Sequence, residues 1–198
     1  MIWGKRLIWL MVIIELINAR PSYDIETGKT IKELKNGISY MDINGDNIKD
    51  LIVVGDFVTT WGGNIYTAYS FYQKTPEGKL LYIPIEGEKG TEAVVYTHSK
   101  IGGCNVKKEI TKISTVRLIN TESGTYLVFA EKNCKEDINK FISDKCFVKV
   151  KVFRYDYEDK MFRKYKSLDV KRLFCDAEEV FGDSKVLHEI FNLLKGGN

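Results

Sequence analysis

Residues 42–50, Asp-Ile-Asn-Gly-Asp-Asn-Ile-Lys-Asp, contain the side chains whose types and spacing best suit a chemical role. Short oxygen-bearing side chains occupy positions 1, 3, 5 and 9 of this stretch: Asp42, Asn44, Asp46 and Asp50. Calcium takes about six to eight oxygen ligands, and alternate residues of a tightly curled loop can point their oxygens inward together. With the backbone carbonyl of Ile48 at position 7 as a further ligand, the stretch predicts a structural Ca²⁺ site.

The residues around this stretch exclude an EF-hand. Position 12 is Val53 instead of a bidentate Glu, and it lies in a β-branched run that predicts a strand. The stretch therefore resembles the strand-flanked acidic loops of integrin-type FG-GAP repeats. Asn47 stands where Gly is usual, and Asn tolerates the left-handed backbone conformation of such a turn. Asx side chains also bond their own backbone, so an Asx-rich turn without metal is the alternative.

Aromatic residues after the loop form a second candidate site. Residues 51–60 and 65–72 predict two strands that pair as a hairpin across the Trp61-Gly62-Gly63-Asn64 turn. The candidates for a ligand-binding face are Trp61, Tyr66, Tyr69 and Tyr72. Aromatic side chains on strands more often belong to the core or to a half-buried sheet surface, so that alternative stays open.

The amino terminus has the pattern of an export signal. Lys5 and Arg6 precede an apolar run, residues 7–14, that is too short to span a bilayer comfortably. Because Ala19 suits cleavage, residues 1–19 are predicted to be a signal peptide, with an uncleaved anchor as the alternative. The cleaved chain would then be periplasmic or secreted, without a membrane span.

Cysteine usage fits an exported chain. The four cysteines allow three pairings if both bridges form: Cys104, Cys134, Cys146 and Cys175. Cys134 and Cys146 bracket a short polar loop between two strand-like runs, so a bridge between them would close a local hairpin. Cys104 and Cys175 would form the second bridge. Zinc is disfavoured, since the chain has no C-x-x-C and only two histidines, both remote from paired cysteines.

Charge and periodicity indicate the fold class. The net charge is +3 with lysine spread along the chain, so nothing supports nucleic-acid binding. Short strand-like runs and turns fill residues 20–198, which we expect to form a single domain, and apolar residues take helical spacing only from Ser184 onward. The fold class is therefore predicted as α+β and mainly β, with antiparallel meander sheets and a C-terminal amphipathic helix. Residues 31–35 are expected to form a helical turn, and residues 110–119 one strand.

Several of these features together resemble the bacterial carbapenem intrinsic-resistance protein CarG family. They are the acidic loop running into residues 51–55, the aromatic run 66–72, Gly102-Gly103-Cys104, and the segment 174–179, Phe-Cys-Asp-Ala-Glu-Glu. The resemblance implies an exported protein that protects a cell from a carbapenem without hydrolysing it. The absence of S-x-x-K with K-T-G, and of enough histidines for a zinc enzyme, agrees that the protein is no β-lactamase.

Two functional hypotheses follow. In the first, the protein binds a β-lactam such as a carbapenem or shields the target of the drug. In the second, a calcium-stabilised module of the cell envelope binds a protein partner and no small ligand. A homo-oligomer is compatible with either hypothesis.

Overall fold

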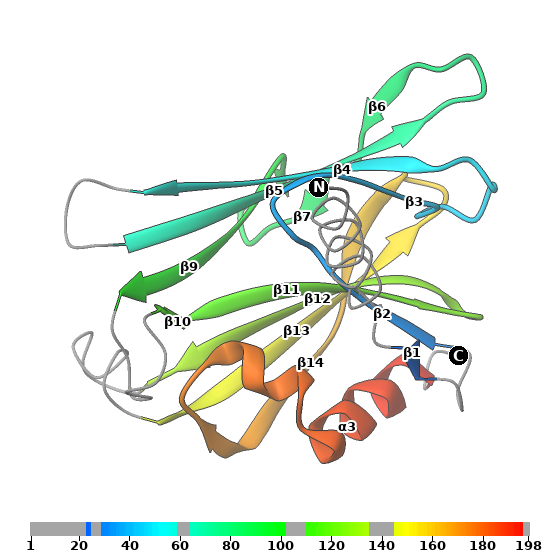
Figure 1. Cartoon of the computed structure of the whole chain (residues 1–198). Helices are drawn as coiled ribbons and strands as arrows, with labels where there is room; N and C mark the ends of the chain where they lie inside the picture. The colour runs from blue at the N-terminus through cyan, green and yellow to red at the C-terminus, as the bar shows by residue number, and fades with distance from the viewer. Residues whose placement is uncertain (1–22, 25–28, 59–63, 102–109, 135–144, 196–198) are drawn as a thin grey trace, which may run out of the picture.

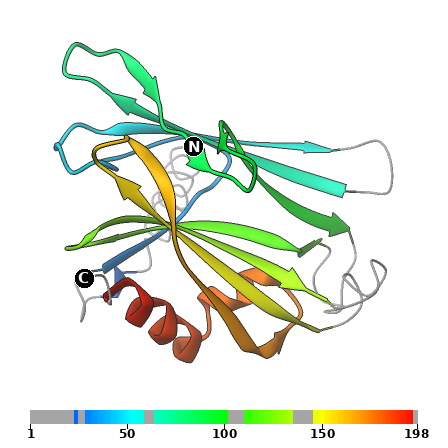
Figure 2. The same ribbon diagram turned by 180° about the vertical axis from the view of Figure 1, so that it is seen from behind.

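Two β-sheets and a C-terminal helix make up the described part of the chain. The computed structural model describes residues 23–24, 29–58, 64–101, 110–134 and 145–195. In Figures 1 and 2 the smaller sheet lies over one face of the larger sheet, and the helix α3 (Ser184–Lys195) lies against the opposite face. The predicted mainly-β class with one C-terminal helix is confirmed. Within these residues, no helix is long and apolar enough to cross a membrane.

The smaller sheet carries the acidic loop. Its six strands are β3 (Gly37–Met41), β4 (Asp50–Val58), β5 (Asn64–Lys74), β6 (Leu80–Tyr82), β9 (Val95–Ile101) and β10 (Ile110–Lys112). The predicted hairpin is confirmed, because β4 and β5 pair antiparallel with Leu51 opposite Tyr72. Ile52 and Val54 of β4 are buried and Leu51 and Val53 are only partly so, as expected for a strand with one face on the core.

The larger sheet holds most of the C-terminal half of the chain. In spatial order its strands are β1 (Tyr23–Asp24), β2 (Lys29–Glu33), β11 (Ser114–Thr121), β12 (Gly124–Asn133), β13 (Cys146–Asp156), β14 (Met161–Phe174), β7 (Ile85–Glu86) and β8 (Thr91–Glu92). After β6 the chain leaves the smaller sheet, and the β7–β8 hairpin joins the edge of the larger sheet. There β7 pairs with β14 in parallel, with Ile85 opposite Phe162.

Each face of the larger sheet packs on a separate apolar core. The core between the sheets includes Ile52, Phe71 and Phe162, whose side chains are fully buried. The core under α3 joins Val150 of β13 to Ile190 of the helix. The alternation of apolar residues along β13, together with the helical spacing in α3, places these side chains toward the two cores.

A short 3-10 helix, η1 (Ala177–Phe181), leads into α3. The carboxylate of Asp176 caps it by accepting the N–H of Glu178 at 2.9 Å. The side chain of Glu178 pairs with the buried guanidinium of Arg117 on β11 and accepts the hydroxyl of Thr115 at 2.7 Å. This ion pair between a buried arginine and a partly buried glutamate ties the C-terminal segment to the larger sheet.

Two predictions about secondary structure are wrong. Residues 31–35 form no helical turn, because residues 31–33 belong to β2, where Ile31 pairs with Ile119 of β11. Residues 110–119 form two strands that lie in different sheets. Between them the N–H of Ile113 donates to the carbonyl of His98 and its carbonyl accepts the N–H of Lys132, each at 2.8 Å, so the backbone crosses from one sheet to the other.

Candidate functional site

The acidic loop joins β3 to β4, and its side chains bond mainly to its own backbone. Asp42 accepts the N–H groups of Gly45 and Asn47 at 2.7 and 2.8 Å, and Asp46 accepts that of Ile48 at 2.7 Å. The amide of Asn44 donates to Asp46 at 2.8 Å. Asn47 has a φ of 65°, the left-handed conformation expected at this position. The loop is thus an Asx-rich turn in its internal bonding.

Asp50 lies apart from the other candidate ligands. Its side chain is fully buried, and its two oxygens accept the N–H groups of Ile43 and Lys74 at 2.8 and 2.9 Å. Burial raises the pKa of this carboxyl above its usual value, the two N–H donors oppose that shift, and Asp46 and Asp42 add to it. No group of three acidic, histidine or cysteine side chains in the described ranges converges as a metal site.

These bonds bear on how a cation would fit. The carboxylates of Asp42 and Asp46 keep further lone pairs for a cation, and the loop carries the oxygen donors that calcium prefers. Both oxygens of Asp50 are already bonded to backbone N–H groups, so this side chain would have to share them. Calcium binding at the loop remains a prediction.

The candidate aromatic face is divided between the two sides of β5. Tyr69 is buried in the core between the sheets, whereas Tyr66 and Tyr72 occupy the alternate positions on the outer side. The ring of Tyr66 stacks on His98 at 4.8 Å, and Tyr72 packs edge-on against Tyr82 at 5.6 Å. Trp61 lies outside the described residues. Among the described candidates, Tyr69 therefore lies on the opposite face of β5 from Tyr66 and Tyr72.

The expected bridge between Cys134 and Cys146 is confirmed. It joins the end of β12 to the start of β13, with Cα atoms 5.1 Å apart. Cys175 is also disulfide-bonded. Its expected partner, Cys104, lies outside the described residues, as does the predicted signal peptide.

A pocket of about 570 Å³ opens beside the β7–β8 hairpin, between that hairpin, β9 and the inner face of the larger sheet. This volume lies within the range of about 300 to 1,000 Å³ that is common for small-molecule sites. The apolar part of its lining includes Val95, Leu127, Phe129 and Phe153. These residues face the space between the sheets because they continue the alternate positions that form the core.

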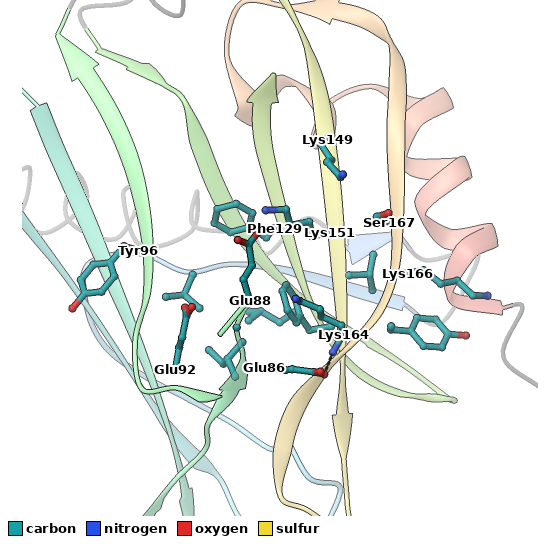
Figure 3. Close-up of a pocket in the computed structure, with 17 residues that line it drawn as sticks. Glu86, Glu88, Glu92, Tyr96, Phe129, Lys149, Lys151, Lys164, Lys166 and Ser167 are labelled. Atoms are coloured by element: carbon teal, nitrogen blue, oxygen red, sulfur yellow. Dashed lines mark hydrogen bonds between the residues drawn. The ribbon is translucent and has the colours of Figure 1, made fainter. Parts of the chain in front are cut away.

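Charged side chains complete the pocket, as Figure 3 shows. Lys149 and Lys151 from β13 and Lys164 from β14 line one side. The ammonium of Lys151 lies 5.7 Å from the centre of the Phe129 ring and 3.3 Å from the carboxylate of Glu131. The β7–β8 hairpin contributes Glu86, Glu88 and Glu92 to the lining.

Sequence reasoning did not identify this pocket. The alternation of residues 147–155 predicts that Lys149 and Lys151 lie near water, and both are in fact half-buried. The available signal was the placement of lysines on the same side of a strand as the core residue Phe153. The pairing of the β7–β8 hairpin with β14 brings three glutamates to the same cavity, and the sequence gives no sign of that pairing.

In the part of the chain that the structure describes, the fold and the pocket define a two-sheet β protein with one outer helix and a small-molecule-sized cavity beside the β7–β8 hairpin. No protein-family model matches this chain, and no curated protein matches it in sequence. The crystal structure of CarG is similar in fold, with a TM-score of 0.58 over 79% of this chain and 98% of that chain. The sequences are 20% identical over the match, so the likeness shows a CarG-like fold.

Proposed function

We propose that this chain is an exported protein of CarG type that protects a cell against a carbapenem or a related β-lactam by binding the drug. The proposed action is binding without hydrolysis, in the periplasm or outside the cell. The likeness of fold to CarG supports the class of protein. Shielding of the drug target is the other form that this protection can take.

The pocket beside the β7–β8 hairpin is the observation that carries the proposal. A β-lactam combines a compact, largely apolar ring system with a carboxylate. Phe129, Phe153 and Val95 offer apolar surface for such a body, and Lys149 and Lys164 line the same cavity. Neither ammonium has an ion pair with another described residue, so both can receive a carboxylate.

Calorimetric titration of the purified protein with a carbapenem tests this proposal directly. Binding should weaken about five-fold or more in Lys149→Ala with Lys164→Ala, since partly exposed charge pairs contribute up to about 1 kcal/mol each. Lys171→Ala is the matched control, because this exposed lysine also lies on β14 but does not line the pocket. Absence of binding to the wild-type protein, or turnover of the drug, would contradict the proposal.

A cellular measurement separates drug binding from target shielding. A sensitive bacterium that expresses the full chain should tolerate more carbapenem than the same strain with an empty vector. If the lysine variants are produced at the wild-type level and lose this tolerance, drug binding explains the protection. Tolerance that survives in the lysine variants would favour shielding of the target.

The outer face of the smaller sheet favours a second candidate, an envelope module that binds a protein partner. Large apolar side chains are unusually exposed there: Ile38 by 65%, Tyr40 by 59%, Phe57 by 44% and Tyr96 by 55%. Cross-linking in intact cells with wild-type protein and with Ile38→Ser and Tyr40→Ser tests this candidate. A defined partner that is lost in the variants, without any change in drug tolerance, would favour it.

A further inference from the structure

Opposite charges are divided between the walls of the pocket. The lysine wall consists of Lys149, Lys151 and Lys164 on β13 and β14, and the glutamate wall consists of Glu86, Glu88 and Glu92 on the β7–β8 hairpin. Lys166 also borders the cavity, but its ammonium donates to the carbonyl of Leu193 at 3.2 Å, on the α3 side of the sheet. The pocket is therefore nearly neutral in sum, with its lysines on the strands of the larger sheet and its glutamates on the hairpin.

The two walls do not neutralise each other by contact. Across the described residues, none of the three glutamates forms an ion pair with any of the three lysines. Lys151 instead pairs with Glu131, which is not part of the lining. One oxygen of Glu86 accepts the backbone N–H of Lys164 at 2.8 Å, which fixes the glutamate wall against β14. The carboxylate of Glu86 is thereby held on the backbone of β14, while Glu88 and Glu92 form no ion pair with a described lysine.

We infer that this pocket selects a zwitterionic ligand, with a carboxylate toward the lysine wall, an ammonium toward the glutamate wall, and an apolar body over Phe129 and Phe153. A simple anion pairs with the lysines and leaves the exposed carboxylates of Glu88 and Glu92 with water alone, so it gains nothing from the glutamate wall. A simple cation pairs with the glutamates and gains nothing from the lysine wall. Electrostatic complementarity of this kind discriminates between ligands of the same size and shape.

The inference rests on the pocket of the proposed function but not on the ligand being a β-lactam. Two matched pairs of probes therefore test the need for an ammonium group separately from the need for a β-lactam ring. Ampicillin and benzylpenicillin share a ring system and a phenyl group, and only ampicillin has an ammonium. The dipeptide phenylalanyl-valine and its N-acetyl derivative differ in the same way without a β-lactam ring.

The experiment measures binding of all four probes to the full chain by calorimetry. Each zwitterion should bind up to about five-fold more tightly than its anionic partner, as one added charge pair at a partly exposed site allows. In Glu88→Gln with Glu92→Gln this ratio should approach one, while binding of benzylpenicillin stays unchanged or improves. Glu158→Gln, on the exposed turn between β13 and β14, is the matched control and should keep the wild-type ratio.

The outcomes distinguish the two proposals. Equal binding within each pair, a ratio that survives the double variant, or no binding of any probe would overturn the inference. Preference for the dipeptide zwitterion, with no binding of either β-lactam or of a carbapenem, would support the inference while contradicting the proposed function. Binding of both β-lactams with equal affinity would support the proposed function and contradict the inference.

Discussion

Replacing Asp50 with Ala removes the fully buried carboxylate of the acidic loop. This side chain accepts the N–H of Ile43 at one end of the loop and the N–H of Lys74 at the end of β5. Asp50 therefore holds the loop to the end of β5, at a residue 24 positions further along the chain. Without this carboxylate, both N–H groups lose their acceptor. Because Ile43 and Asp50 are both fully buried, water has no ready access to replace it.

The size of the effect follows from these two bonds. A buried donor left without a partner costs about 1 to 3 kcal/mol, and relief of the buried charge offsets part of the sum, so the expected loss is about 2 to 4 kcal/mol. For a chain of this size that corresponds to a fall of about 4 to 16 °C in the unfolding midpoint. Asp46→Ala is the control. This exposed carboxylate accepts only the N–H of Ile48 and the amide of Asn44, both within the loop, so its loss should cost about 1 kcal/mol or less.

The pH dependence gives a second readout of the same carboxyl group. Burial raises the pKa of Asp50, so the folded state binds this proton more tightly than the unfolded state does. The free energy of unfolding from this group should therefore fall as the pH rises from the usual Asp pKa to the raised one. Asp50→Asn, which cannot ionise, should lack that component.

Thermal unfolding followed by circular dichroism, in steps from about pH 3 to pH 7, measures both effects around the usual Asp range. The chelator EDTA is present throughout, so that a bound cation does not alter the carboxylates. An unchanged midpoint in Asp50→Ala, or an equal loss in Asp46→Ala, would refute the assignment of Asp50 as the anchor of the loop.

Three further predictions use the same unfolding measurement. If the acidic loop binds calcium, a hundredfold excess of calcium over Kd should raise the free energy of unfolding of the wild type by about 2.7 kcal/mol, and that of Asp46→Ala by much less. Identical unfolding midpoints in calcium and in chelator would mean that the loop is only an Asx-rich turn. Replacing Cys134 and Cys146 together with Ser should cost about 3 kcal/mol in urea unfolding, because the bridge closes a short loop, and an unchanged midpoint would count against it. Glu178→Ala should cost up to about 3 kcal/mol, because the buried guanidinium of Arg117 then keeps only Glu33 as an ion-pair partner. Arg117→Met combined with Glu178→Ala should recover part of that loss.

Local patterns in the sequence predicted those elements whose buried side chains recur at a regular spacing within one segment. The hairpin of β4 and β5 follows from two strand-forming runs on either side of a turn, whereas the strand β13 and the helix α3 follow from apolar spacing. The run from Ile110 to Thr121 was harder, because its division at Ile113 depends on two partners far away in sequence, β9 and β12. Partner choice of this kind is a tertiary property, and the residues of the run carry no mark of it.

The candidate sites show the same limit. The spacing of Asp42, Asn44 and Asp46 predicted a tight oxygen-lined loop, and the loop has that local geometry. It did not predict that Asp50 turns into the core, since its acceptor role depends on the N–H of Lys74 across the sheet. The pocket could not be predicted at all, because its two walls meet only through the pairing of β7 with β14.

That pairing also sets an order for folding. Phe162 donates its N–H to the carbonyl of Pro84 at 2.9 Å, and the contact between Glu86 and Lys164 spans 78 residues. Such long-range contacts give a high contact order, and chains of this kind fold slowly, in about milliseconds to seconds. During synthesis the β3–β4–β5 meander can form early, but the β7–β8 hairpin has no strand to join until β14 has left the ribosome. The pocket is thus completed late, and a chain truncated before residue 161 would retain part of the smaller sheet but lack the pocket beside β7–β8.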